Sequence, residues 1–468
     1  MVMTAFSSAQ TAFQRPWKLS AGSGATRRRV LAGAAGAWGT MMAGLALGAC
    51  GGIGTRESQP ATSKGPVTIR LATDWLSGAR GDTLKAGLAA FHEQHPTIKV
   101  EVEAITGDYW TAVNTQLAAG TVQEVVLFEG NFFHSFKDQG AFTPIDAALK
   151  KYRVNMADYS VVPGIYQDKG KQYGMPFQLV ASGWFYNVDL FQERGLRPPN
   201  ENWTWDDVLA AAQALTQPDR QQYGIWVRSD AQFCWGPLIF SAGARWHNAD
   251  KTRTLLTDQG GLEAFQWIVD LIHRHRVSPA PSQVNEIRGS FANPFVAGKI
   301  GMFPTGLQGI GNTVRQVGDR FRWALMPTPK HPRTKKATHV WNDQPHVLTN
   351  AATKKGVVEE ATQLIIFLAG DVVQGRVAVD RGSIPVLKRQ QTGAEYLKPP
   401  PDNMRQVAIN LSDPDIQTPG FIKGWDEWWK AINDEVARAF NGEVAAQQAL
   451  RNAVTAGDAV LSRYGPQR

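Results

Sequence analysis

Strand-like and helix-like patterns alternate along this 468-residue chain from about Val67 onward. VTIRLATDW is short and β-rich, DTLKAGLAAFHEQHP has helical apolar spacing and meets Pro96, and IKVEVEAI alternates as a strand does. The alternation continues through EVVLFEG, GMPFQLVASGWFYN and the helical runs WTWDDVLAAAQALT and GLEAFQWIVDLIHRH. This order predicts an α/β fold in which helices flank sheets. From about Gly420 the pattern is helical only.

A leader precedes the part that is expected to fold. Residues 30–49 carry no charge, and about 20 such residues are long enough to span a bilayer as a helix. The run is mostly Ala and Gly, which bury little apolar surface, so it is a weak permanent anchor. Three arginines at 27–29 precede it, and Leu47-Gly48-Ala49-Cys50 follows. This combination predicts a cleaved export signal.

The end of the leader resembles the lipobox of bacterial lipoproteins, in which the peptidase cuts before an acylated cysteine. This resemblance implies that residues 1–49 are a signal peptide and that Cys50 carries lipid on the outer face of the cytoplasmic membrane. Thr26 to Leu31 resembles the twin-arginine signal, although arginine triplets also serve ordinary secretion. Residues 50–65 are rich in Gly, Ser, Thr and Pro, which predicts a flexible tether.

Charge and cysteine content narrow the possible classes of protein. The chain has 49 Lys and Arg against 41 Asp and Glu, a formal net charge of +8. Residues 1–49 hold five of the basic residues and no acidic residue, so the remainder carries only about +3. This argues against nucleic-acid binding, which needs Lys and Arg clustered on a folded face. The two cysteines are Cys50 and Cys234, so lipidation of Cys50 leaves no disulfide to form.

The order of segments in residues 184–227 resembles a known family. A strand ends in Tyr-Asn, a helix begins Asp-Leu-Phe, and a Gly-Leu turn, Pro-Pro, a Trp-Thr-Trp-Asp helix start and Tyr-Gly follow. FHEQHPTIKVEV, FVAGKIGMF, ATQLIIFLAGDVVQGRVAVDRGSIP and AFNGEVAAQQALRNAV agree in the same order. Together, over residues 67–460, they resemble the extracellular solute-binding proteins of ATP-binding cassette importers, specifically the carbohydrate-binding family that includes maltodextrin binders.

The resemblance implies a two-lobe periplasmic-binding-protein fold of type II, with a ligand cleft between the lobes. It places chain crossings near Phe177 to Ser182, near His339 to Gln344 and at 386–398, so each lobe is discontinuous in sequence. The expected first lobe is 66–178 plus about 343–390, and the second is about 179–340 plus 391–468. Such lobes close around a ligand by bending at the crossings.

The residues expected to contact a ligand are those that suit a sugar. Sugar rings present apolar C–H faces ringed by hydroxyls, so a sugar site combines aromatic platforms with carboxylates and amides. The chain has 16 tryptophans. The expected contacts are Asp74, Trp75, Glu129, Trp184, Trp235, Phe303, Trp341, Asn342, Arg381, Trp425 and Trp429.

Several of these expected contacts also have a plainer explanation. Glu129 could merely precede a helix that starts at Gly130, and Arg381 could form a salt bridge within one lobe. The resemblance favours Trp235 as the strongest ligand contact, yet large aromatics are more often core residues. Trp425 and Trp429 share a helix face, and packing by one tryptophan of this helix in the core is expected.

The expected ligand is a mono- to trisaccharide, delivered to a membrane permease by a monomer without cofactor. The segment FPTGLQGI lacks the tryptophan that maltodextrin binders carry at the corresponding place, so that Phe303 or nothing replaces it and long maltodextrins are less favoured. A glycerol-phosphate or phosphodiester binder is one alternative, and Arg381 would then pair the phosphate. A secreted carbohydrate-active enzyme with two unmarked carboxylates is the other. The sequence has no Gly-x-Ser-x-Gly, no His-Glu-x-x-His, no phosphate loop with Gly-Lys-Ser/Thr and no Rossmann glycine motif. His273 and His275 do not share a helix face as metal ligands would.

Overall fold

The computed structural model describes residues 65–468, except residues 106, 162–163, 259, 419–421 and 468. Residues 65–468 form one compact unit. The leader and Cys50 lie outside the described residues, so their predicted processing stays a prediction. Among the described helices, none alone has the length and hydropathy to cross a membrane, and one bent pair, Val358–Leu368 with Asp371–Asp380, meets the criteria of length and composition.

An eight-stranded mixed sheet organises this unit. Its strand order is β2-β1-β3-β10-β6-β8-β7, and β9 also pairs with β6. The parallel β1 and β2 and the intervening α1 confirm the β-α-β opening that the sequence predicts. The strands are β1 (Val67–Ala72), β2 (Ile98–Glu103), β3 (Val125–Leu127), β6 (Gly174–Asn187), β7 (Tyr223–Ile225), β8 (Ile300–Gly306), β9 (Trp323–Met326) and β10 (Trp341–Leu348), with a separate hairpin of β4 (Gln167–Asp168) and β5 (Lys171–Gln172).

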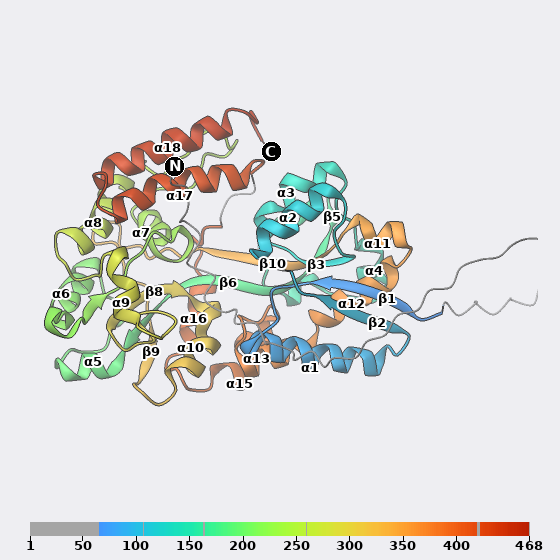
Figure 1. The fold of residues 1–468 in the computed structure, drawn as a ribbon, viewed down its shortest axis with the longest axis horizontal. Coiled ribbons are helices and arrows are strands. Elements are labelled where there is room, and N and C mark those ends of the chain that lie inside the picture. The colour runs from blue at the N-terminus through green and yellow to red at the C-terminus, as the bar shows by residue number, and fades with distance from the viewer. Residues whose placement is uncertain (1–64, 106, 162–163, 259, 419–421, 468) are drawn as a thin grey trace, which may run out of the picture. The chain divides into compact units, whose positions relative to one another are not determined.

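The long strand β6 belongs to both halves of the sheet. Its residues 174–181 pair with β10, and its residues 182–187 pair with β8 and β9. We call β2, β1, β3, β10 and residues 174–181 the first half, and residues 182–187, β8, β7 and β9 the second half. All 14 residues of β6 are buried, which explains why its sequence is a nearly continuous apolar run. Figure 1 shows β6 and β10 running side by side between the two halves.

Helices cover both halves, as the α/β prediction requires. The first half carries α1 (Gly78–Gln94), α2 (Tyr109–Ala119), α3 (Phe133–Phe136), α4 (Asp146–Lys151), α11 (Asn350–Lys355), α12 (Val358–Leu368) and α13 (Asp371–Asp380). The second half carries α5 (Val188–Glu193), α6 (Trp205–Leu215), α7 (Gly236–Ser241), α8 (Gly261–His273), α9 (Val284–Arg288), α10 (Ile310–Val317), α16 (Arg405–Leu411), α17 (Trp425–Phe440) and α18 (Ala446–Leu461). The last two pack together at the C-terminal end, where the sequence pattern is helical only (Figure 1).

Short elements complete the chain. The helices α14 (Lys388–Gln391) and α15 (Ala394–Leu397) pack against α13. A π-helical turn, η5, covers Ala231–Trp235. The 3-10 turns are η1 (Gly130–Phe132), η2 (Lys137–Gln139), η3 (Met156–Asp158), η4 (Pro218–Arg220), η6 (Pro281–Gln283) and η7 (Leu307–Gly309).

A third chain crossing follows α15. The segment Lys398 to Asp402 contains three consecutive prolines and ends at a bridge between Asp402 and Ala324 of β9. The Asp402 carbonyl accepts the N–H of Leu325 at 3.1 Å, and α16 then packs on β6. The chain therefore passes from the helices of the first half to the second half through a stretch whose backbone the prolines restrict.

The pairing of β6 with β10 contains a bulge beside Pro345. Gln344 pairs with Gln178, but Pro345 pairs with Pro176, so Phe177 is left over between them. Proline has no N–H to donate, and in a central strand it is tolerated at such a bulge. The buried ring of His346 stacks against Phe177 with centroids 4.1 Å apart. Neither ring nitrogen of His346 has a hydrogen-bond partner among the described residues.

This burial predicts that His346 weakens the fold in acid. Burial lowers the pKa of His346 to about 3, whereas an unfolded histidine has a pKa of about 6.5. As the pH falls below about 6.5, the unfolded chain binds a proton that the folded protein does not bind until about pH 3. The free energy of unfolding should therefore fall by about 1.4 kcal/mol per pH unit in this window on account of this residue.

Urea unfolding between pH 8 and pH 4 measures this slope. His346→Phe keeps an aromatic ring against Phe177 and should flatten the pH dependence. His275→Phe, just after α8, is the matched control and should leave the slope as it is. Equal slopes for the wild type and His346→Phe would contradict the assignment.

Candidate functional site

Two carboxylates follow the ends of neighbouring parallel strands in the first half of the sheet. β1 and β3 pair in parallel, with Ala72 opposite Val126, so the chain leaves both at the same edge. Asp74 follows β1, and Glu129 follows β3. In open α/β sheets this edge, beyond the carboxyl ends of the strands, is where ligands bind.

The Glu129 carboxylate is held by side-chain amides. Gln344 Nε2 donates to Glu129 Oε2 at 2.6 Å, and Asn342 Nδ2 donates to Glu129 Oε1. Asn131 Nδ2 lies 3.4 Å from the same Oε1. Gly130 brings the chain close to β10, because a Cβ on this residue would lie 2.8 Å from the Asp343 carbonyl oxygen. Glu129 therefore precedes η1, as the plainer explanation has it, and also joins a polar network.

Two further buried side chains extend this network. Gln178 Nε2 donates to Gln344 Oε1, and Trp75 Nε1 donates to Gln178 Oε1 at 3.2 Å. Gln178 and Trp75 have no exposed surface. The network thus runs from β1 through β6 and β10 to Glu129.

The two carboxylates have raised pKa values. Burial raises the pKa of Glu129 to about 7, the hydrogen bond from Gln344 opposes this, and the nearby Asp74 raises it further. Burial also raises the pKa of Asp74, against the attraction of Arg80, whose Nη1 lies 3.3 Å from Asp74 Oδ2. Asp74 Oδ1 is buried and has no partner among the described residues. A ligand hydroxyl could donate to this oxygen.

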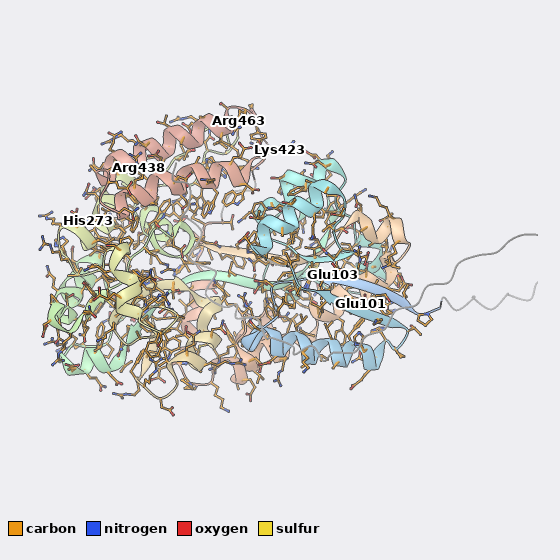
Figure 2. The ribbon with its side chains drawn as sticks, viewed as in Figure 1. Glu101, Glu103, His273, Lys423, Arg438 and Arg463 are labelled. Carbon is orange, nitrogen blue, oxygen red and sulfur yellow. The ribbon has the colours of Figure 1, made fainter. Side chains whose placement is uncertain are left out.

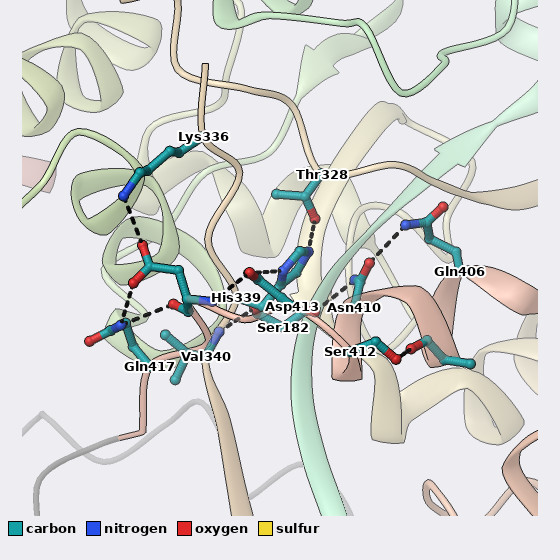
Figure 3. Close-up of polar contacts among 12 residues, drawn as sticks. Ser182, Thr328, Lys336, His339, Val340, Gln406, Asn410, Ser412, Asp413 and Gln417 are labelled. Atoms are coloured by element: carbon teal, nitrogen blue, oxygen red, sulfur yellow. Dashed lines mark hydrogen bonds and ion pairs between the residues drawn. The ribbon is translucent and has the colours of Figure 1, made fainter. Parts of the chain in front are cut away.

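A second buried polar cluster joins the crossing segments near residues 182, 339 and 410 (Figure 3). His339 Nδ1 lies 2.7 Å from Asp413 Oδ2, and His339 Nε2 lies 2.9 Å from Thr328 Oγ1. Ser182 of β6 accepts from the Val340 N–H at 2.9 Å through its hydroxyl and from Asn410 Nδ2 at 3.1 Å through its carbonyl. Hydrogen bonds therefore connect the chain segments around residues 182, 339 and 410.

The segments around the two halves also contact each other through two ion pairs and one aromatic residue. Lys423 Nζ lies 2.6 Å from Asp138 Oδ2, and Arg315 of α10 lies 3.2 Å from Asp82 of α1. Figure 2 shows Lys423 at the end of α17 that faces α2 and α3. Phe132 packs against both hydrophobic clusters of the protein. Each exposed ion pair contributes little to stability, so the packing of Phe132 is the strongest of these contacts.

Comparison with known proteins identifies the family. The model of the bacterial extracellular solute-binding protein family matches residues 76–375. The chain belongs to this family.

Two relatives and one solved structure illustrate the match. The mannitol-binding protein of Pseudomonas aeruginosa is 25% identical over 436 residues, covering 86% of this chain and 94% of that protein. A putative binding protein of Brucella abortus is 23% identical over 410 residues, covering 86% and 95%. An ABC substrate-binding protein of Listeria monocytogenes, solved in complex with cycloalternan, matches with a TM-score of 0.73 and 22% identity over 85% of this chain and 99% of that one.

The structural match confirms the expected fold class. This solute-binding protein has the two-lobe α/β fold of these structures, with the two halves of its sheet joined by the crossing strands. The family is extracellular and consists of binding proteins, so the protein acts after export and by binding. Within the described residues, no group of three or more His, Cys, Asp or Glu side chains could hold a metal ion.

The structure brings several of the expected contacts of this solute-binding protein together. Trp75, Glu129 and Asn342 lie in the first-half network, Asp74 is near enough to raise the pKa of Glu129, and Trp341 begins β10 opposite Ala181. Trp75 is buried against Phe177, with ring centroids 4.6 Å apart.

The aromatic residues expected in the second lobe lie mostly in its core. Trp184 and Trp235 are buried, and the Trp235 ring lies 5.9 Å from those of both Trp246 and Phe265. Trp425 and Trp429 stack at 4.8 Å, and Trp429 keeps some exposed surface. Trp428 is fully buried, as expected of one tryptophan of this helix, with Nε1 donating to Thr254 Oγ1 at 3.0 Å, and Trp425 is buried as well.

Phe303 and Arg381 are occupied by other contacts. Phe303 stacks on Trp226 with centroids 4.8 Å apart, and Arg228 lies over its ring at 4.9 Å. The Arg381 guanidinium donates to the carbonyls of Lys398 and Pro400 in the third crossing. The expected salt bridge of Arg381 is thus replaced by hydrogen bonds to backbone oxygens.

Three members of the first-half network were missed by sequence reasoning, namely Gln178, Gln344 and Asn131. Gln178 is the lone amide in the otherwise apolar run GMPFQLVASG, which is a signal that a buried polar group needs a partner. Gln344 follows Trp341-Asn342-Asp343 directly, but nothing in the sequence indicates its partner.

The burial of Trp235 predicts a large stability cost for its truncation. Trp235 is 0% exposed, so Trp235→Ala should lower the free energy of unfolding by about 3 to 5 kcal/mol through the cavity that it leaves. Urea unfolding measures this cost. Trp429→Ala, at a partly exposed position of α17, is the control and should cost clearly less. A small effect of Trp235→Ala would return Trp235 to the set of ligand contacts.

Proposed function

We propose that this protein is the carbohydrate-binding component of an ATP-binding cassette importer, which captures a mono- to trisaccharide by closure of its lobes and delivers it to a membrane permease. The observation that carries the proposal is the pair of strand-end carboxylates, Asp74 and Glu129, set among amides beside the crossing strands. Carboxylates and amides are the groups that pair sugar hydroxyls. The mannitol-binding relative and the cycloalternan complex support a polyhydroxylated ligand.

The lobes close by bending where the chain crosses between the two halves of the sheet. We assign residues 66–178 plus about 343–390 to the first lobe and about 179–340 plus 391–468 to the second, except that α15 packs against α13 and stays with the first lobe up to the crossing at Lys398 to Asp402. The change of partner of β6 between Ala181 and Ser182 supports this division. The contacts of Lys423 with Asp138 and of Arg315 with Asp82 support a closed arrangement, and opening would break them.

The partly exposed residues Asp74, Glu129 and Trp429 are the first ligand contacts in this proposal. Opening of the lobes would uncover further expected contacts that are buried in the closed arrangement, Trp341 and Asn342 among them. Aromatic rings would then stack on sugar faces, and carboxylates would bind hydroxyls.

A neutral sugar fits this site better than a phosphate. A phosphate binder needs cationic donors, but Arg381 is engaged by backbone carbonyls and Arg80 is paired with Asp74. Two carboxylates near one another would also repel an anion. The glycerol-phosphate alternative and the enzyme alternative are therefore kept as outcomes of the experiment below.

A thermal-shift screen tests the ligand class. The panel contains maltose, lactose, mannitol, cycloalternan and glycerol 3-phosphate, and a bound sugar should raise the melting temperature with concentration by mass action. X-ray scattering with the same sugar should show a small decrease in the radius of gyration, because the lobes close. A rise with glycerol 3-phosphate alone, or conversion of the bound sugar to product, would contradict the proposal.

Substitutions at the carboxylates serve as the site-specific part of this screen. Glu129→Gln and Asp74→Asn should each weaken sugar binding by about 1.5 to 3 kcal/mol, the range for a hydrogen bond to a charged group. Glu101→Gln is the control, because Glu101 is an exposed residue of the edge strand β2 (Figure 2). Equal affinities for all three variants would remove the carboxylates from the site.

We also propose that Cys50 anchors the mature protein through lipid on the outer face of the cytoplasmic membrane. The lipobox-like sequence Leu47-Gly48-Ala49-Cys50 and the extracellular family support this. The mature protein acts as a monomer that docks on the permease.

Loss of the anchoring thiol should release the protein from the membrane. Cys50→Ala should leave the chain exported but soluble after fractionation, whereas Cys234→Ala, at a buried cysteine of the second lobe, should stay with the membrane as the wild type does. Firm membrane retention of Cys50→Ala after signal cleavage would show that Cys50 is not the anchor.

A further inference from the structure

Two buried glutamines lie between the proposed ligand carboxylate and the crossing strands. Gln344 of β10 and Gln178 of β6 are directly opposite each other in the strand register. Both are buried, and neither was among the residues expected to contact ligand. Their amides point toward one another and toward Glu129, because one donates to the next.

Each hydrogen bond of this pair has a defined direction. Trp75 Nε1 can only donate, so Gln178 must present its Oε1 to the indole at 3.2 Å. Gln178 then presents Nε2 to Gln344 Oε1, which leaves Gln344 Nε2 to donate to Glu129 Oε2 at 2.6 Å. The indole therefore fixes the orientation of both amides. This series of hydrogen bonds ends with an N–H of Gln344 that donates to the Glu129 carboxylate.

The backbone supports the same arrangement. The bulge at Pro345 directly follows Gln344, and Phe128 donates its N–H to the Pro345 carbonyl at 2.8 Å. Gly130 packs on the carbonyl of Asp343. The segment that carries Glu129 is thus held along β10, and the side chain has little freedom to choose other partners.

We propose that Gln178 and Gln344 are positioning residues that hold the Glu129 carboxylate, in its ionised form, against the two crossing strands. They act on the ligand through Glu129 and do not touch it. The proposal rests on the proposed function only in taking Glu129 as a ligand contact.

The groups around Glu129 define what a titration would report. Asp74 raises the pKa of Glu129, and Gln344 and Asn342 lower it by hydrogen bonding to the carboxylate. The other charged or titratable side chains of this region each have a partner. Arg80 pairs with Asp74, Tyr109 donates to the Leu127 carbonyl, and Tyr166 donates to Asp343.

The test is a carboxyl titration that needs no ligand. Glutamate labelled with carbon-13 at Cδ is followed by NMR from pH 5 to pH 9, and Glu129→Gln assigns the signal by its loss. Gln344→Met keeps the volume but removes the donor, so the titration midpoint of Glu129 should rise by about one pH unit or more. Gln178→Met removes the partner that fixes Gln344, so the midpoint should rise by less.

The matched control is Gln374→Met. Gln374 is equally buried and donates to the Phe177 carbonyl at 3.1 Å on β6, but it does not contact Glu129. It should cost stability and leave the midpoint unchanged. The proposal is overturned if Gln344→Met and Gln178→Met fold but leave the midpoint at its wild-type value, or if Gln374→Met shifts it equally.

The two proposals fail separately in these experiments. A carboxyl titration that responds to Gln344→Met supports the positioning role even if no sugar in the panel binds. An unchanged midpoint in a protein that still binds sugar through Glu129 removes the glutamines and leaves the proposed function intact. If Gln344→Met does not fold, the shift of the Glu129 titration midpoint in Gln178→Met decides the proposal.

Discussion

The pairing of β6 with its neighbours is the interaction on which the rest of this structure depends. One strand of 14 buried residues pairs with β10 over its first part and with β8 and β9 over its second part. Without β6, the first half of the sheet therefore lacks its last strand and the second half lacks the strand between β8 and β9. The same strand contributes Gln178 to one polar cluster and Ser182 to the other, so it holds the candidate site and the crossing segments in one frame.

The second constraint is the burial of charge beside these strands. A buried carboxylate is costly unless donors surround it, and Glu129 obtains its donors from β10. Asp74 has Arg80 on one oxygen and no partner within the described residues on the other. A buried acceptor without a partner has lost its hydrogen bond to water. A ligand donor that binds such an acceptor restores a hydrogen bond there, which favours binding. A group that lowers the stability of the ligand-free protein can thus also favour ligand binding.

The fold could be predicted from local patterns, and the candidate site only in part. The β-rich run VTIRLATDW and the alternation in IKVEVEAI correctly predicted β1 and β2, because both patterns depend on local sequence alone. Glu129 and Asn342 could be chosen as polar residues at a strand end and a crossing. Gln178 and Gln344 could not be paired from sequence, because their register depends on a bulge between residues far apart in the chain. The burial of Trp235 and Phe303 could not be predicted either, since an aromatic residue can have the same local sequence in a core and in a cleft.

The shared strand has a consequence for how the chain folds. The register that joins Ala181 to Trp341 brings together residues about 160 positions apart, and β6 joins the first half of the sheet through it. Closing so long a loop costs entropy before its contacts are made, which slows folding and leaves strand edges exposed until then. Local units such as the α17–α18 hairpin have no such loop to close. A substitution that weakens the β6–β10 register would then show first as a poor yield of folded protein, before any loss of ligand affinity could be measured.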